Sequence, residues 1–214
     1  MASDRSNLQN FHRGIFLASA SPRRQDLLRQ IGVRFQLLNH QVDEQILSGE
    51  LPRDFVTRMA REKAISGLQQ VPQDYQPVVL GADTIVVIDS NILGKPRDRR
   101  DALSMLQRLS GREHFVLTAV TVTNASETQA VISETAVSVG PITKDQAQAY
   151  WETGEPADKA GAYAVQGLGS IFIKAIKGSY SGVVGLPIFE TSRLLTHFGV
   201  KCWQPNDQGL EIHQ

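Results

Sequence analysis

The chain has 214 residues, and its 22 lysines and arginines balance its 22 aspartates and glutamates. An apolar content of 41% with 21% charged residues is typical of a globular protein and excludes a wholly disordered chain. The neutral balance gives no basis for broad binding to nucleic acid or to a membrane surface. Any anion site must therefore come from local clustering of basic side chains.

The single cysteine, Cys202, excludes an internal disulfide. The polar start of the chain lacks the apolar segment of a secretory signal, and no apolar run approaches the roughly 18 residues of a membrane span. We expect a cytoplasmic protein with no nucleic-acid partner and no membrane contact. We expect one domain over residues 12–200, flanked by flexible tails at 1–11 and 204–214.

The first third of the chain predicts strand, helix, strand and helix. The apolar run 14–18 is typical of a buried strand. Ser21 then fits a helix N-cap, with Pro22 at the first helical position, where its missing N–H is tolerated. Residues 33–38 predict a second strand. Residues 52–67 predict a second helix, because their apolar side chains fall on one face.

The middle of the chain predicts more strand than helix. Residues 78–88 indicate a strand with a break at Gly81-Ala82-Asp83. A turn then leads to a short return strand at 92–93 and a helix over 98–109. Alternating apolar residues across 115–139 predict two long antiparallel strands.

The last third is rich in glycine. Thr143-Lys144-Asp145-Gln146 resembles a capping box that opens a helix. Residues 154–185 hold seven of the 17 glycines, which favours loops that approach something closely, interrupted by a strand at 171–173. A last helix is expected from Pro187. This order predicts a mixed α/β fold with both parallel and antiparallel strand pairs.

The first candidate for chemistry is the segment from Ser19 to Arg24. Backbone N–H groups at a helix start favour an anion, and Ser19, Arg23 and Arg24 add groups suited to phosphate. The segment lacks the glycine-rich run of a Walker loop. The alternative is a capped surface helix with solvated arginines.

A second candidate is Asp83, followed by Thr84, because a carboxylate within an apolar strand is unusual. Asp83 could hold a metal or act as a general base on water. The alternative is an aspartate in a turn between two strands.

Further candidates are lysines and acids that stand near predicted helices. Lys95 lies on a loop that enters a helix, and Lys63 lies beside an apolar helix stripe. Either lysine could reach phosphate, or could be solvated or snorkelling. The adjacent Asp43 and Glu44 suit a hard cation such as Mg²⁺, although such pairs are also common as surface acids.

The glycine-rich loop offers Gln166, whose amide both donates and accepts and so suits the edge of a nucleobase. Tyr163 in the same loop could stack on a ligand or pack in the core. A structural loop with a core tyrosine is the alternative for both residues.

Taken together and in order, these segments resemble the Maf family of septum-formation inhibitor proteins over about residues 15–198. The resemblance rests on the motifs Leu17-Ala18-Ser19-Ala20-Ser21-Pro22-Arg23-Arg24, Arg61-Glu62-Lys63-Ala64, Gly81-Ala82-Asp83-Thr84-Ile85-Val86, Gly94-Lys95-Pro96-Arg97-Asp98, and Asp158-Lys159-Ala160-Gly161-Ala162-Tyr163 with Gln166-Gly167.

The resemblance implies an α/β fold in which a long twisted mixed β-sheet with flanking helices forms a two-lobed cleft, similar to inosine triphosphate pyrophosphatases. It implies hydrolysis of dTTP and UTP, with modified pyrimidine triphosphates, to a monophosphate and pyrophosphate. A sister branch acts on 7-methyl-GTP, and a catalytically weak nucleotide-binding regulator of cell division is a further alternative. The family also implies a divalent cation, Mg²⁺ first and Mn²⁺ or Co²⁺ next, and a homodimer.

The resemblance also implies roles for single residues. Asp83 matches the proton acceptor, with Lys63 and Lys95 linked to catalysis. The residues matched to substrate binding are Ser19, Arg23, Arg24, Thr84 and Gln166. Glu44 matches an acidic residue implicated in metal binding, which Asp83 is expected to share.

Overall fold

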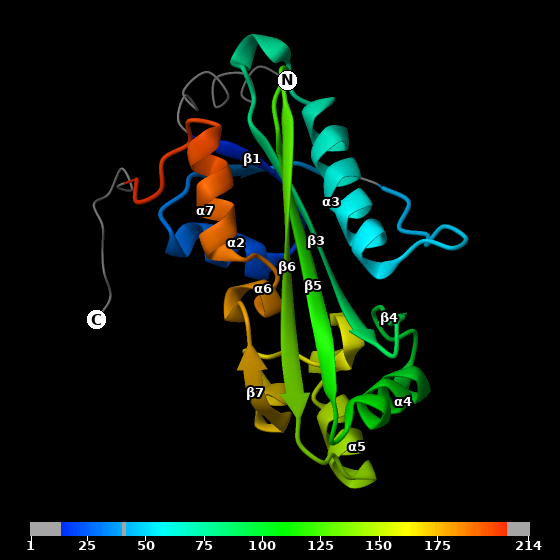
Figure 1. The fold of residues 1–214 in the computed structure, drawn as a ribbon. Coiled ribbons are helices and arrows are strands. Elements are labelled where there is room, and N and C mark those ends of the chain that lie inside the picture. Colours follow the sequence, from blue (N-terminus) through cyan, green and yellow to red (C-terminus); the bar gives the residue numbers. More distant parts are fainter. Residues whose placement is uncertain (1–13, 40–41, 205–214) are drawn as a thin grey trace.

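The computed structural model describes residues 14–39 and 42–204. The expected tails, apart from Gln204, therefore lie outside the described residues. The described chain forms one seven-stranded mixed sheet with helices on both faces, so the predicted α/β class is confirmed (Figure 1). None of the described helices has the length and apolar character needed to cross a bilayer.

The strands follow the order β2-β1-β3-β5-β6-β7, with β4 paired to β3 as well. Their bounds are β1 (Ile15–Ala18), β2 (Phe35–Leu37), β3 (Val79–Ile88), β4 (Asn91–Leu93), β5 (Glu113–Thr123), β6 (Thr128–Val139) and β7 (Ile173–Lys177). β1 pairs in parallel with β2 and β3, whereas every other pair is antiparallel.

Helices cover the two faces of the sheet unequally. The α-helices are α2 (Pro22–Gln30), α3 (Pro52–Leu68), α4 (Arg99–Leu109), α5 (Lys144–Glu152), α6 (Tyr180–Val184) and α7 (Ile188–His197). Short 3₁₀ turns are η1 (Gln73–Tyr75), η2 (Glu155–Asp158), η3 (Ala160–Ala162) and η4 (Leu168–Phe172). In Figure 1, α3 lies on one side of the long strands, and α2, α6 and α7 lie on the other.

Alternating side chains of β3 pack into two separate hydrophobic cores, one on each face of the sheet. Ile85 and Val87 pack with the apolar stripe of α3, while Ala82 and Val86 point to the larger core on the opposite face. By the same alternation Asp83 faces α3, and Thr84 faces α2 and α6. Two neighbouring polar side chains of one strand thus serve opposite faces of the sheet.

The expected break at Gly81-Ala82-Asp83 is wrong, because β3 runs unbroken from Val79 to Ile88. Gly81 is required for a different reason. A Cβ atom at this position would lie 2.5 Å from the carbonyl oxygen of Ala60 and 2.5 Å from the backbone nitrogen of Ala64. The glycine therefore allows the backbone of α3 to lie directly against β3.

The expected strand at 171–173 is also misplaced. Residues 168–172 form the 3₁₀ turn η4, and the strand β7 begins only at Ile173.

The two predicted helix caps differ in outcome. Ser21 does stand at the N-cap of α2, but its side chain makes no capping hydrogen bond. The capping box at Thr143 is confirmed, since the Thr143 and Gln146 side chains each bond the other's backbone N–H.

Candidate active site

A gap along one edge of β3 lies beside a cavity. β1 pairs with β3 only as far as Ala18 opposite Gly81, and β4 pairs with β3 only from Leu93 opposite Val86. Residues 82–85 of β3 therefore have a strand neighbour on one side only among the described strands, namely β5. The segments that leave β1 and β4 at this gap carry the Ser19 and Lys95 positions.

The cavity beside this gap has a volume of about 630 Å³. Every residue that the family resemblance matched to catalysis, substrate or metal lines it: Ser19, Arg23, Arg24, Glu44, Lys63, Asp83, Thr84, Lys95 and Gln166. Asp43 does not, and its carboxylate instead accepts from the backbone N–H of Gln45. The structure thus brings together side chains up to 147 positions apart in sequence (166 − 19), while the chemical role of each stays a prediction.

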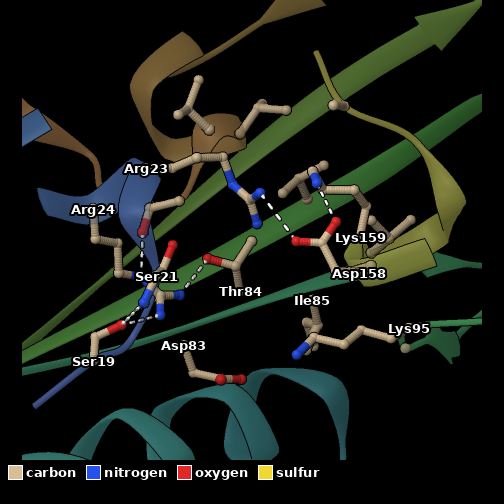
Figure 2. Close-up of a pocket in the computed structure, with 18 of the residues that line it drawn as sticks. Ser19, Ser21, Arg23, Arg24, Asp83, Thr84, Ile85, Lys95, Asp158 and Lys159 are labelled. Carbon is tan, nitrogen blue, oxygen red and sulfur yellow. Dashed lines mark hydrogen bonds and ion pairs between the residues drawn. The ribbon is translucent and has the colours of Figure 1, made fainter. Parts of the chain in front are cut away.

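Arg24 organises the wall of the cavity that is formed by α2 (Figure 2). Its guanidinium donates from Nε to the Gly185 carbonyl (2.8 Å), from Nη1 to Ser19 Oγ (3.0 Å) and from Nη2 to Thr84 Oγ1 (3.1 Å). Burial lowers the pKa of Arg24, and the charge of Asp83 opposes that shift. A guanidinium stays charged in such a setting. The surface-helix alternative is therefore wrong for Arg24.

The hydroxyl of Ser19 is available to a ligand. Ser19 is buried, and its Oγ accepts from Arg24 Nη1 and, at 3.3 Å, from the backbone N–H of Ser21. A hydroxyl oxygen has two acceptor sites and one proton. Because both acceptor sites are used, the remaining capacity of Ser19 is donation.

The orientation of the Thr84 hydroxyl follows from its neighbours. Thr118 Oγ1 donates to the Gly182 carbonyl at 2.8 Å, and this uses its only proton. In the 3.0 Å contact between the two threonines, Thr84 must therefore be the donor and Thr118 the acceptor. Thr84 also accepts from Arg24, so it has one acceptor site left for a ligand.

Lys63 joins the two candidate acids. Its Nζ lies 2.8 Å from Asp83 Oδ1 and 2.6 Å from Glu44 Oε1. The Lys63 side chain is 7% exposed and that of Asp83 is 13% exposed, whereas Glu44 stands on an exposed loop. Partial burial alone would raise the pKa of Glu44, but hydrogen bonding to Lys63 and the charges of Lys95 and Arg24 hold it below its usual value. Asp83 is mid-strand, so the turn-aspartate alternative is wrong.

These two carboxylates can be tested against the divalent cation that the family implies. Among the described residues, no group of three or more His, Cys, Asp or Glu side chains comes together as a metal site. Glu44 and Asp83 nevertheless converge on one ammonium group and line the same cavity. Mg²⁺ usually keeps several waters and binds one or two carboxylates plus substrate phosphates. The donor set fits such an ion and does not fit an all-protein cage.

A second ion-pair cluster, between helix α2 and the end of η2, lines the same cavity (Figure 2). Asp158 lies 3.8 Å from Arg23 Nη1 and forms a close ion pair with Lys159. Lys159 is largely buried and Asp158 is exposed. The cavity therefore gathers five cationic side chains, Arg23, Arg24, Lys63, Lys95 and Lys159, against three carboxylates.

Sequence reasoning assigned no site role to Asp158 and Lys159, which line this cavity, or to Thr118, which contacts Thr84. Asp158 and Lys159 stand in the glycine-rich loop, and their place in that loop was the signal that could have found them. Thr118 gave no such signal, since it is one threonine within an alternating strand. Its contact with Thr84 depends on the register of β5 against β3.

The fold and the cavity define an α/β protein with a cleft suited to a polyanion. The family model for Maf-like proteins matches residues 14–198. The chain therefore belongs to the Maf family.

Curated relatives span nearly the whole chain. The dTTP/UTP pyrophosphatase of Pseudoalteromonas atlantica is 50% identical over 187 residues, which cover 87% of this chain and 97% of the relative. The proteins of the same name from Saccharophagus degradans and Methylobacillus flagellatus are 48% and 49% identical, covering 89% and 87% of this chain and 91% and 93% of the relatives. Among solved structures, the Ham1 protein of Staphylococcus aureus aligns with a TM-score of 0.38 at 10% identity, covering 59% of this chain and 72% of that chain. That likeness is too low to support a conclusion.

Proposed function

We propose that this protein hydrolyses dTTP and UTP to the nucleoside monophosphate and pyrophosphate. The observation that carries the proposal is the cavity itself, which is lined by five cationic side chains and by the largely buried carboxylate of Asp83. Relatives at 48–50% identity bear the name dTTP/UTP pyrophosphatase. A site with this charge pattern suits phosphoryl chemistry, which depends on positioning and on neutralising charge.

The phosphates can bind to hydrogen-bond donors that are not fully used within the protein. Ser19 offers its hydroxyl proton, and the Arg24 guanidinium has five N–H groups of which three are used within the protein. Lys95 is exposed at the cavity and adds a further positive charge. Together these groups hold the triphosphate chain in one orientation, which lowers the entropic part of the barrier.

Asp83 is the general base of the proposal. It takes a proton from a water molecule whose oxygen forms a new bond to the α-phosphorus. The bond from that phosphorus to the bridging oxygen breaks, and pyrophosphate leaves with the electron pair. Lys63 holds the Asp83 carboxylate in place through the 2.8 Å contact. A positioned base of this kind contributes about 10²–10⁴-fold to the rate.

Glu44 and Asp83 are the residues that would hold a divalent cation, with Mg²⁺ first and Mn²⁺ or Co²⁺ as substitutes. Such a cation, when bound, neutralises phosphate charge and polarises the scissile anhydride.

Gln166 is the candidate residue for recognition of the pyrimidine edge, because its exposed amide lines the cavity and both donates and accepts. Cytoplasmic location, a homodimer and the absence of a nucleic-acid partner belong to the same proposal, and the neutral net charge supports the last of these.

Pyrophosphate release over a nucleotide panel tests the proposal. With Mg²⁺ present, dTTP and UTP should be turned over faster than GTP and 7-methyl-GTP, and Asp83→Asn should reduce the rate by about 10²-fold or more in a folded variant. A preference for 7-methyl-GTP would assign the chain to the sister activity. Nucleotide binding without release from any nucleotide would instead favour the division regulator.

A further inference from the structure

The loop that carries Gln166 is fastened to a side chain outside the cavity. Glu155, in η2, accepts three hydrogen bonds: Oε1 accepts from the Tyr150 hydroxyl at 2.6 Å and from the Gly169 N–H at 2.9 Å, and Oε2 accepts from the Leu168 N–H at 2.9 Å. Tyr150, at the end of α5, in turn accepts from the buried N–H of Ala164 at 3.1 Å. Neither Glu155 nor Tyr150 lines the cavity.

Two glycines let the loop lie against this pair. A Cβ atom at Gly167 would lie 2.1 Å from Glu155 Oε2, and one at Gly169 would lie 2.4 Å from the Tyr150 hydroxyl oxygen. Neither glycine has a positive φ, so both are required by close approach and not by backbone conformation. Contact with Glu155 and Tyr150 therefore explains the glycines at positions 167 and 169.

Gln166 lies between the two points of attachment. Ala164 is fixed on one side by Tyr150, and Leu168 and Gly169 are fixed on the other by Glu155. The Gln166 side chain is exposed and has no hydrogen-bond partner within residues 14–39 and 42–204. Its position at the cavity is therefore set by the backbone on either side, and not by contacts of its own.

The protonation states of Glu155 and Tyr150 favour the hydrogen bonds that hold the loop. Burial alone would raise the pKa of Glu155, but the bonds from Tyr150, Gly169 and Leu168 hold it below its usual value. Burial and the neighbouring carboxylate raise the pKa of Tyr150. Glu155 thus stays a carboxylate with acceptor sites only, and Tyr150 keeps the proton that it donates. Hydrogen bonds to a charged acceptor are the stronger class.

We propose that Glu155 is a positioning residue for substrate choice, which acts through Tyr150 and the 164–169 loop to hold the Gln166 amide at the nucleobase. The proposal rests on the proposed function, since it requires a nucleotide in the cavity. It adds a residue that touches no substrate and that the family motifs do not single out.

The test compares Glu155→Gln with Glu152→Gln, a matched change at an exposed glutamate of α5. Glu155 accepts one hydrogen bond from Tyr150 and two from the loop. The glutamine keeps one oxygen, so at least one of these three bonds is replaced by a clash between donors. We expect the KM for dTTP to rise by about tenfold while kcat changes less than about twofold, and the preference for dTTP over GTP to fall. Tyr150→Phe should act in the same direction, because it leaves the Ala164 N–H without its acceptor.

The decisive measurement repeats Glu155→Gln in a Gln166→Ala background. If Glu155 acts through Gln166, the second substitution should produce little further change in KM or in nucleotide preference. Equal effects in both backgrounds, or a loss of kcat with KM unchanged, would overturn the proposal. Should Glu155→Gln fail to fold by circular dichroism, Tyr150→Phe is taken through the same cycle. Failure of the proposed function is distinguishable, because the unmodified protein would then release no pyrophosphate from dTTP or UTP.

Discussion

Lys63 and Asp83 form an ion pair between helix α3 and strand β3, with 2.8 Å between Nζ and Oδ1. Both side chains are largely enclosed, at 7% and 13% exposed. Removal of one partner from such a pair leaves a poorly solvated charge, whereas removal of both does not. The pair therefore links the stability of the α3–β3 contact to the candidate chemistry at Asp83.

Lys63→Met should lower both stability and activity. The unpaired Asp83 and the nearby Glu44 would repel each other, and we expect a loss of about 3 kcal/mol in the free energy of unfolding. Pyrophosphate release from dTTP should fall at least about tenfold. Adding Asp83→Asn should restore much of the stability but none of the activity. Urea unfolding and the release assay check these outcomes, with exposed Lys144→Met as the control. A stable, fully active Lys63→Met protein would refute the prediction.

Gly81→Ala should separate α3 from β3. The new Cβ would meet backbone atoms of Ala60 and Ala64 at 2.5 Å, and backbone cannot give way as a flexible side chain does. We expect destabilisation of about 1–3 kcal/mol or more, with reduced activity because Lys63 is carried away from Asp83. Gly140→Ala is the control, since its Cβ would meet only an ordinary contact at 3.7 Å. Equal unfolding midpoints for the two variants would count against the close approach.

Much of the candidate site could be predicted from sequence because its residues stand in short segments with local signals. Ser19 and Arg24 share a helix start, and Asp83 is a charge within an apolar strand. What local signals could not give is the order of contacts between these segments. The Arg24 contact with Thr84 joins residues 60 positions apart, and the contact of Thr118 with the Gly182 carbonyl spans 64 positions.

The incorrect strand boundaries have a related cause. Glycine at position 81 indicates a break when only the chain itself is considered, since glycine weakens strands. Here the helix α3 packs against that glycine and preserves the strand. Glu155 could not be predicted either, because its three partners include two backbone N–H groups that have no signature in sequence. In both cases, the unbroken strand at Gly81 and the hydrogen bonds of Glu155, the structure depends on tertiary contacts that local sequence does not encode.

His114 should make stability depend on pH. It is buried in β5, its Nε2 lies 2.7 Å from the Tyr163 hydroxyl, and burial lowers its pKa from 6.5 to about 4. Between these pH values the unfolded chain binds a proton that the folded protein does not, so stability falls as pH drops from 6.5 towards 4. The contribution is about 3 kcal/mol.

His114→Gln keeps a hydrogen-bonding group for Tyr163 and removes the titration. As pH falls from 6.5 to 4, the unmodified protein should therefore lose about 3 kcal/mol of unfolding free energy relative to His114→Gln. The same substitution at His197, which is exposed, is the control. A pH-independent difference, measured by urea unfolding from pH 7 to pH 4, would contradict the role of His114.

Two buried threonines of β5 offer an internal comparison of hydrogen-bonded and unbonded hydroxyls. Thr118 donates to the Gly182 carbonyl and accepts from Thr84, whereas the Thr121 hydroxyl has no partner among the described residues. Thr118→Val should cost about 1–3 kcal/mol, because it leaves the Gly182 carbonyl without its donor and the Thr84 hydroxyl proton without its acceptor. Thr121→Val should be neutral or stabilising, since it removes a buried group that makes no bond.

The same pair of variants separates stability from ligand binding. Without Thr118 as acceptor, the Thr84 proton is free to point into the cavity, so a group that presents only an acceptor site becomes one that can also donate. The KM for dTTP should therefore change in Thr118→Val and stay constant in Thr121→Val. Thr118→Ser, which keeps the hydroxyl, should restore the original KM while retaining a small loss of stability from the missing methyl group. A KM that follows stability across all three variants would show that the orientation of Thr84 has no part in binding.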